Sequence, residues 1–220
     1  MNQVLASDIA VPGNLSTRIY ADLQRKLIVG DLRPAENLSI RTLAEEYQVS
    51  AMPVREALRQ LASEDALIGA AKKAYRVPDL TSEQAADLFF VRAVLEGAAA
   101  EIAAERVTDA DIKILAKHNV DLESAWEKRH ASDFLFANYQ FHRHVYSLTG
   151  NSALQSMIDA LYVRTGPWLA FGITNLVRPD KWMGEHDNII AALKQRDKAG
   201  TRRLMEEDAR WGVEVFRELG

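Results

Sequence analysis

The stretch that decides the fold of this 220-residue chain is LSIRTLAEEYQVSAMPVREALRQLASEDAL, residues 38–67. Its first part predicts a short helix over residues 40–47, followed by a tight two-residue connection. Ser50 then begins a second helix, because its hydroxyl can accept the free N–H groups of a first helical turn. Pro53 fits in that turn, where its missing N–H costs nothing. Two helices joined so sharply predict a helix–turn–helix.

The residues around this stretch complete a winged helix-turn-helix. Upstream, a helix that Gly30 ends is predicted by apolar residues that recur every four positions, Leu15, Ile19, Leu23 and Leu27. Downstream, the β-like runs at residues 66–68 and 74–77 predict a two-stranded hairpin. We therefore expect a winged helix-turn-helix over residues 15–78, preceded by a flexible arm over residues 1–14.

After residue 78 the sequence predicts only long helices. Caps and apolar periodicity place six of them, over about residues 82–104, 109–128, 132–148, 152–174, 179–195 and 197–220. Within the fourth, Gly166-Pro167 is expected to kink or break the helix. The expected fold class is mainly α, with the winged helix-turn-helix followed by an all-α six-helix bundle over residues 79–220.

Composition excludes several classes of protein. The chain has no Cys, which excludes a disulfide framework, a thiolate zinc site and a thiol nucleophile. No run of 18 apolar residues is present, so no membrane span is expected. The first residues lack the basic and apolar regions of a signal peptide. We expect a cytoplasmic protein.

The charge is distributed unevenly along the chain. The 27 Lys and Arg against 31 Asp and Glu make the whole chain acidic, with a net charge of −4. Residues 1–78 hold 10 basic and 9 acidic side chains, a net +1, whereas residues 79–220 hold 17 and 22, a net −5. The acidity therefore belongs to the helical part, and local placement of cations is the better guide to a nucleic-acid partner.

The chain resembles a known family in four places. Residues 38–67 resemble the DNA-binding domain of GntR-family bacterial transcription regulators. The helical part resembles the FCD effector domain of the FadR branch, in VRAVLEGAAAEIAAE, NYQFHRHVYSLTGN and EHDNIIAALKQRD. Six helices rather than seven resemble the VanR-type subgroup. The resemblance implies a bacterial, nucleoid-associated homodimer that binds operator DNA and a small effector.

The helix–turn–helix would present the N-terminal end of its second helix to base edges in the major groove. The residues expected to contact DNA are Arg41, Ser50, Ala51, Met52, Arg55, Arg59, Lys72 and Lys73. Arg41 matches a DNA-contacting position of the family, and the lysines would form the wing tip. The family usually has Arg-Thr after the capping Ser, so Ala51 and Met52 could contact a thymine methyl instead. A merely solvated basic surface is the alternative.

The resemblance also implies a metal site. Metal-binding members of the family combine an Asp/Asn-x-x-x-His pair with two further His residues. Here Asn138 and His142 form the pair, His186 follows, and Asp208 stands where the last His would be. Two imidazoles, a carboxylate and an amide oxygen suit one divalent transition metal per chain, Zn²⁺, Ni²⁺ or Mn²⁺, with open positions for a ligand. A hydrogen-bonded polar core is the alternative.

Three further residues are candidates for binding an effector, Arg92, Arg164 and Tyr139. Both arginines lie inside otherwise apolar helices, and a buried guanidinium needs an anionic partner. For Arg92 that partner is either a ligand carboxylate or Glu96, which follows at i+4. Tyr139 could line the same pocket, although aromatic residues at helical spacing are more often core.

Three functions from different classes fit these features. The first is a homodimeric, ligand-responsive transcription regulator, more often a repressor, that binds a short inverted repeat and responds to a small organic acid. The second is a metal-dependent enzyme with a nucleic-acid-binding head; the sequence offers no HExxH, nucleophile elbow or phosphate loop for it. The third is an architectural DNA-binding dimer without an effector. We expect the first, and no enzyme.

Overall fold

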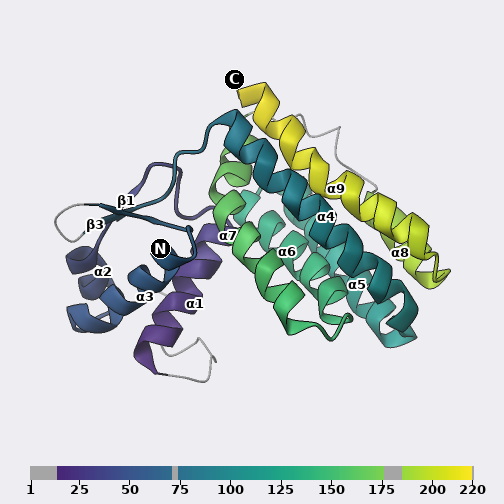
Figure 1. Cartoon of the computed structure of the whole chain (residues 1–220), viewed down its shortest axis with the longest axis horizontal. Helices are drawn as coiled ribbons and strands as arrows, with labels where there is room; N and C mark the ends of the chain where they lie inside the picture. The colour runs from purple at the N-terminus through teal and green to yellow at the C-terminus, as the bar shows by residue number, and fades with distance from the viewer. Residues whose placement is uncertain (1–13, 71–73, 176–184, 220) are drawn as a thin grey trace.

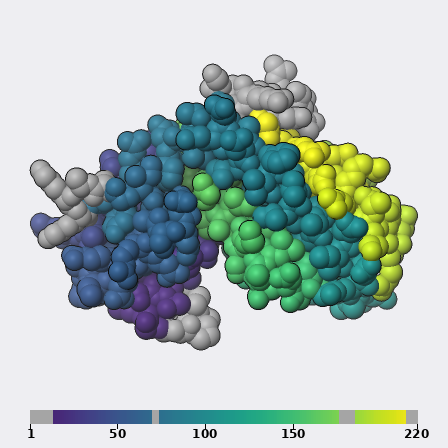
Figure 2. Space-filling view, viewed as in Figure 1, coloured from purple at the N-terminus to yellow at the C-terminus, as the bar shows by residue number. Residues whose placement is uncertain are grey.

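The computed structural model describes residues 14–70, 74–175 and 185–219, which form two lobes. Figure 1 shows a smaller lobe of helices and a sheet beside a larger lobe made only of helices. Below we refer to residues 14–77 as the head and to residues 81–219 as the bundle. The lobes meet along one side and leave a notch between them at the surface (Figure 2).

The head combines short helices with a small sheet. In chain order its elements are α1 (Leu15–Ile28), β1 (Asn37–Ser39), α2 (Ile40–Glu46), α3 (Ala51–Ser63), β2 (Ile68–Ala70) and β3 (Ala74–Arg76). Its core forms where α1 packs on α3, and the side chains of Leu23, Leu27, Leu58 and Leu61 are fully buried there. The predicted helix–turn–helix is present as α2 and α3.

The sheet has one strand more than the sequence predicts. The strand order is β1-β3-β2 with antiparallel pairing, and Leu38 of β1 lies opposite Tyr75 of β3. The predicted two-stranded hairpin is present as the antiparallel pair β2 and β3, and β1 is the strand that the sequence did not predict. The first strand is only three residues long and ends at Ser39, whose hydroxyl accepts the N–H of Thr42 to cap α2. A run of three residues is too short to show the alternation that predicts a strand. Its last residue, Ser39, is also the cap of α2, and a capping Ser is typical of a loop.

The bundle contains six helices within the described residues, as predicted. They are α4 (Ser82–Arg106), α5 (Asp109–Glu127), α6 (Ala131–Ser147), α7 (Ser152–Asn175), α8 (Glu185–Lys194) and α9 (Lys198–Leu219). Capping boxes begin two of them, at Thr81 with Gln84 and at Thr108 with Asp111. The most extensive contact between helices of the described residues is that of α4 with α9, which lie side by side (Figure 1). The mainly α fold class is confirmed.

Helix α7 (Ser152–Asn175) is continuous at the position where the sequence predicts a kink or a break. The helix α7 runs unbroken from Ser152 to Asn175 with Pro167 inside it, so the expected break at Gly166-Pro167 does not occur. Both residues are buried, and α7 packs against α1, α4, α6 and α9. This tertiary packing holds the helix together across the missing N–H. No helix among the described residues is long and apolar enough to cross a membrane.

Candidate functional site

The exposed N-terminal end of α3 is the first candidate site. Ala51 and Met52 occupy its first turn, and Met52 is 61% exposed. Arg55 and Arg59 follow at successive turns, and both are exposed. A groove between α2 and α3 is lined by Arg41, Ala51 and Arg55 among others. A helix end with exposed side chains and neighbouring cations has the form of a DNA-reading surface.

The N-cap of α3 lacks the side-chain hydrogen bond that the sequence predicts. Ser50 is the N-cap residue as predicted, but its side chain makes no capping hydrogen bond. Pro53 is the third residue of the helix, and it lacks the N–H that a capping hydroxyl usually accepts. The hydroxyl of Ser50 is therefore available at the surface to donate a hydrogen bond to a phosphate oxygen.

Arg41 lies on the same face as the end of α3. Its Nε donates to Glu45 Oε1 over 2.9 Å, but the Arg41 side chain is 88% exposed. An ion pair this exposed contributes little and can exchange for a phosphate. Lys72 and Lys73, expected at the wing tip, lie outside the described residues.

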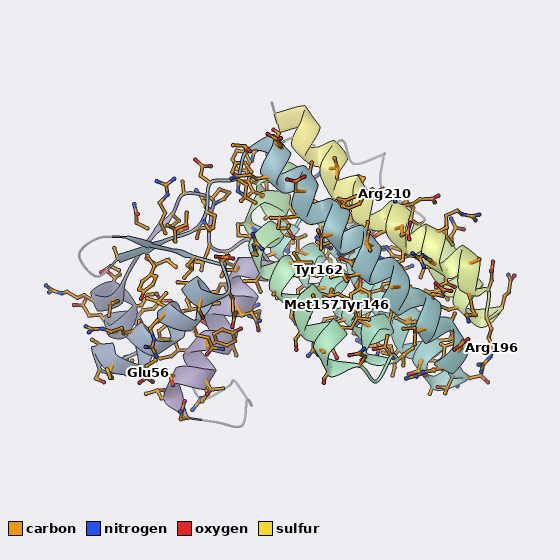
Figure 3. The ribbon with its side chains drawn as sticks, in the orientation of Figure 1. Glu56, Tyr146, Met157, Tyr162, Arg196 and Arg210 are labelled. Atoms are coloured by element: carbon orange, nitrogen blue, oxygen red, sulfur yellow. The ribbon has the colours of Figure 1, made fainter. Side chains whose placement is uncertain are left out.

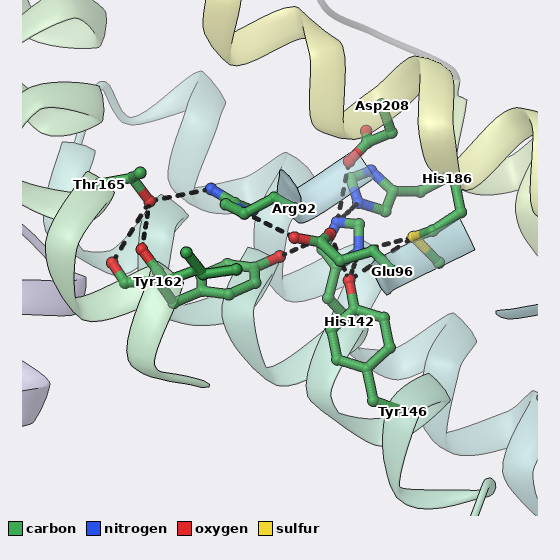
Figure 4. Close-up of polar contacts among 10 residues, drawn as sticks. Arg92, Glu96, His142, Tyr146, Tyr162, Thr165, His186 and Asp208 are labelled. Atoms are coloured by element: carbon green, nitrogen blue, oxygen red, sulfur yellow. Dashed lines mark hydrogen bonds and ion pairs between the residues drawn. The ribbon is translucent and has the colours of Figure 1, made fainter. Parts of the chain in front are cut away.

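The second candidate site lies inside the bundle, where α6, α8 and α9 bring three side chains together. His142 Nε2 lies 3.1 Å from His186 Nε2 and 3.1 Å from Asp208 Oδ2. Both imidazoles are buried, and the three residues form a group that could hold a metal ion (Figure 4). Donors that share one ion at about 2.0–2.2 Å stand roughly 3.0–3.4 Å apart, so the separations fit.

The hydrogen bonds behind His142 indicate which of its nitrogens faces an ion. Tyr146 donates its hydroxyl proton to Glu96 Oε2 over 2.5 Å. The Tyr146 oxygen therefore accepts from His142 Nδ1, 3.1 Å away, so Nε2 is the nitrogen that faces Asp208, with either a proton or a metal ion between the two atoms. Two acceptors at 3.1 Å repel unless a proton or a metal ion lies between them. Asp208 Oδ1 is also buried without a hydrogen-bond partner among the described residues, as a site for a cation requires.

Electrostatics in this cluster also favour a cation. Burial lowers the pKa of His186 to about 4, so its imidazole is neutral at pH 7 and can act as a ligand. Burial alone would raise the pKa of Asp208, but His142, His186 and Arg92 outweigh it and lower that pKa to about 2. A neutral imidazole beside an ionised carboxylate is the state that binds a divalent metal.

Glu96 connects this cluster to the rest of the bundle core. Its Oε1 accepts from Arg92 Nε over 2.7 Å, and both side chains are buried. The guanidinium of Arg92 also donates to Thr165 Oγ1 over 3.1 Å and lies 3.8 Å from the centre of the Tyr162 ring. Glu96, which is one of the two partners expected for Arg92, pairs with it. Figure 3 places Tyr146 and Tyr162 inside the bundle, whereas Arg196 and Arg210 lie on its outside.

The structure brings together some of the remaining candidates and separates others. Asn138 is buried and lines a cavity of about 20 Å³ together with Arg92 and Asp208. Tyr139 packs edge-on against Tyr162 and donates to Asp159 over 2.9 Å, so it lies one ring away from the cluster. Arg164 is half-buried on α7 and neither lines this cavity nor joins the bonds of the cluster.

Sequence reasoning missed three members of the cluster, namely Tyr146, Thr165 and Met205. The Met205 sulfur lies 3.1 Å from His142 Nδ1. Tyr146 follows His142 at i+4, which is a signal that could have identified it. Thr165 and Met205 are far from the other members in sequence, and only the folded bundle places them there.

Comparisons with known proteins agree with this geometry. Residues 15–77 match the family described as "Bacterial regulatory proteins, gntR family", and residues 87–210 match the FCD domain. The Escherichia coli K12 protein "HTH-type transcriptional regulator McbR" is 32% identical, over 92% of this chain and 93% of its own length. The "HTH-type transcriptional repressor GlaR" of the same organism is 26% identical, over 86% and 89%.

Solved structures give the same result. The structure of E. coli McbR/YncC has a TM-score of 0.86 at 30% identity and covers 94% of this chain and 99% of its own. A putative GntR regulator from Rhodococcus sp. RHA1 has a TM-score of 0.75 at 18% identity, covering 92% and 97%, and shares the fold. The chain therefore belongs to the GntR family of bacterial regulatory proteins, in the FadR-type branch that carries an FCD domain, and it is a transcription regulator rather than an enzyme.

Proposed function

We propose that this regulator binds a short inverted-repeat operator as a homodimer and represses transcription. A small organic acid, held together with a divalent metal ion in the bundle, then changes its affinity for DNA. The observation that carries the proposal is that one chain combines two sites. These are the exposed end of α3 in the head and the buried cluster of His142, His186 and Asp208 in the bundle.

DNA binding by α3 is supported by what its first turns expose. Arg55 can bond the O6 and N7 atoms of guanine or clamp a phosphate, and Arg59 lies one turn further on the same face. Ala51 and Met52 offer apolar contact, which suits a thymine methyl. Arg41 and the unengaged Ser50 hydroxyl can meet phosphates on either side.

A homodimer is supported by an apolar face on α4. Phe90 is 62% exposed, and Val91 and Val94 are each 42% exposed on the same helix. Exposed apolar residues gathered in this way mark a protein interface. A second copy of the chain would cover the face and relate two recognition helices by a two-fold axis, which matches an inverted repeat. Repression is supported by GlaR, a relative whose name describes a repressor.

A metal ion in the bundle is supported by the donors themselves. His142, His186 and Asp208 would hold the ion, with Asn138 nearby as an oxygen donor. The metal ion would supply a fixed positive charge in a buried site and open coordination positions for a ligand atom. Arg92 and Glu96 cancel each other, so a divalent ion with Asp208 leaves a net charge of +1. A buried net charge of +1 favours the binding of one carboxylate group, which neutralises it.

The size of the cavity indicates how such an acid would act. About 20 Å³ holds roughly one water-sized ligand. An organic acid therefore needs the lining side chains, among them Phe134, Leu169 and Trp211, to move. Binding that requires movement gives the ligand different affinities for two shapes of the bundle, which is what a responsive regulator needs.

The test is a titration of the full-length protein with common metabolic carboxylates, each with and without Zn²⁺. The DNA would be a duplex selected by the same protein from a random pool. We expect at least one acid to raise the melting temperature and to release the duplex. If no acid or metal changes DNA affinity while the duplex binds tightly, the protein is an architectural DNA-binding dimer without an effector.

A further inference from the structure

A chain of buried polar contacts runs from the cluster of His142, His186 and Asp208 to helix α7. His142 Nδ1 lies 3.1 Å from the Tyr146 hydroxyl, which donates to Glu96 over 2.5 Å. Glu96 accepts from Arg92 over 2.7 Å, and Arg92 donates to Thr165 Oγ1 over 3.1 Å. Figure 4 shows these contacts as one connected series. Below we refer to His142, Tyr146, Glu96, Arg92 and Thr165 as the polar relay.

Burial makes the polar relay sensitive to any change at one end. Each of its five residues is at most 3% exposed, so water cannot replace a lost partner. A buried polar group without a partner is costly, and bonds in a dry interior reinforce one another. A movement of His142 or Arg92 on ligand binding therefore has to be matched by movement of the other members, Thr165 included.

Thr165 stands directly before the point where the bundle contacts the head. A Cβ added to Gly166 would lie 2.4 Å from the carbonyl oxygen of Leu27 and 2.6 Å from that of Ile28. The backbone of α7 thus contacts the end of α1 with no side chain between them. Four residues along α7, Ala170 fills the space beside Gly30, which has a φ of +74° just after α1. A shift of α7 at Thr165 therefore moves the end of α1.

We propose that the Arg92–Thr165 hydrogen bond and the adjoining contact of Gly166 with α1 form the coupling point between the ligand site and the DNA-binding head. The inference rests on the proposed function and names how its ligand site is regulated. Thr165 acts here as a positioning residue, since it touches neither metal ligands nor DNA. Because α1 packs on α3, a displaced α1 reorients the helix that reads DNA.

The variant that tests this is Thr165→Val, which keeps the shape of the side chain and removes the acceptor for Arg92. Thr174→Val is the matched control. Both hydroxyls donate back to their own helix, Thr165 to Leu161 O over 2.9 Å and Thr174 to Ala170 O over 2.8 Å. Only Thr165 also accepts from Arg92. Thr165→Ser keeps the acceptor and serves as the conservative variant.

The measurement is the dissociation constant for the selected duplex, with metal-free protein and at saturating Zn²⁺, together with the Zn²⁺ dissociation constant without DNA. We expect Zn²⁺ to change DNA affinity at least about fivefold in the wild type, Thr165→Ser and Thr174→Val, and less than about twofold in Thr165→Val. The Zn²⁺ affinity of Thr165→Val should stay within about threefold of wild type. A merely structural Thr165 would change the melting temperature and leave the ratio of the two DNA constants intact.

The coupling point and the metal-linked response are contradicted by different results. Full coupling in a folded Thr165→Val protein would overturn the coupling point while leaving the proposed function in place. A wild-type protein that binds Zn²⁺ without any change in DNA affinity would overturn the metal-linked response itself, and with it the coupling point.

Discussion

At the scale of single residues, Glu96 is the side chain on which the buried polar contacts converge. It accepts hydrogen bonds from Arg92, Tyr146 and Tyr162, the last over 3.5 Å. The i+4 spacing of Arg92 and Glu96 allowed their pairing to be predicted as one of two alternatives. The contacts with Tyr162 and Thr165 could not be predicted, because they join helices more than 60 residues apart in sequence.

Replacing Glu96 by Ala should strongly destabilise the bundle. The change leaves the guanidinium of Arg92 buried without its anionic partner, which costs about 3–5 kcal/mol. Glu101→Ala is the matched control, since Glu101 lies on the same helix and pairs with Arg202 at the surface. Its loss should cost about 0–1 kcal/mol. Urea unfolding monitored by circular dichroism measures both, and equal effects would contradict the central role of Glu96.

At the same scale, Arg55→Ala should weaken specific DNA binding. Loss of a bidentate base contact costs about 1–3 kcal/mol, or roughly 5- to 150-fold in affinity. Arg203→Ala removes the same charge from an exposed position on α9 and should leave binding within about twofold. Fluorescence anisotropy with the selected duplex compares them. Wild-type binding by Arg55→Ala would remove α3 from the DNA interface.

At the scale of elements, sequence patterns predicted helices well where they are long and capped. Cap residues and apolar periodicity placed the first two helices of the bundle within two residues at either end, and the structure has capping boxes at Thr81 and Thr108. Short or interrupted elements were less predictable. Strand β1 has too few residues for a pattern, and α7 continues through Pro167 because its neighbours hold it. In both cases contacts distant in sequence outweigh local preference.

The contact between α1 and α7 gives a prediction at this scale. Gly166→Ala places a methyl group 2.4 Å from the carbonyl oxygen of Leu27, so the two backbones must separate. Overpacking of this kind costs about 1–3 kcal/mol. Gly69→Ala is the control, because nothing lies within 4 Å of the added carbon there. Its effect on the free energy of unfolding should be within about 0.5 kcal/mol, and an equally small effect of Gly166→Ala would contradict the close contact.

At the scale of the whole molecule, the acidity of the chain belongs to the bundle. The near-neutral head exposes Arg41 and Arg55 in the groove where α2 and α3 meet. Because the overall attraction to DNA is weak, we propose that tight binding comes from a dimer that contacts two half-sites. The division into a DNA-reading part and a helical part could be predicted from the sequence. The apolar face on α4 that we propose as the dimer interface could not be predicted, because it depends on which residues of α4 stay exposed.

That face can be tested directly. Val94→Asp puts a charge into the apolar face of Phe90, Val91 and Val94, and should convert the dimer into a monomer that binds the inverted repeat weakly. Val120→Asp makes the same change at an exposed position on α5, outside that face, and should leave the dimer intact. Light scattering coupled to size-exclusion chromatography gives the masses. A dimeric Val94→Asp protein would place the interface elsewhere.

The most direct test of a metal-linked response compares the affinity of the intact protein for the selected duplex without metal and at saturating Zn²⁺. We expect a change of at least about fivefold in the wild type, and none in His142→Ala, which lacks a metal ligand. Equal affinities with and without bound Zn²⁺ in the wild type would contradict it.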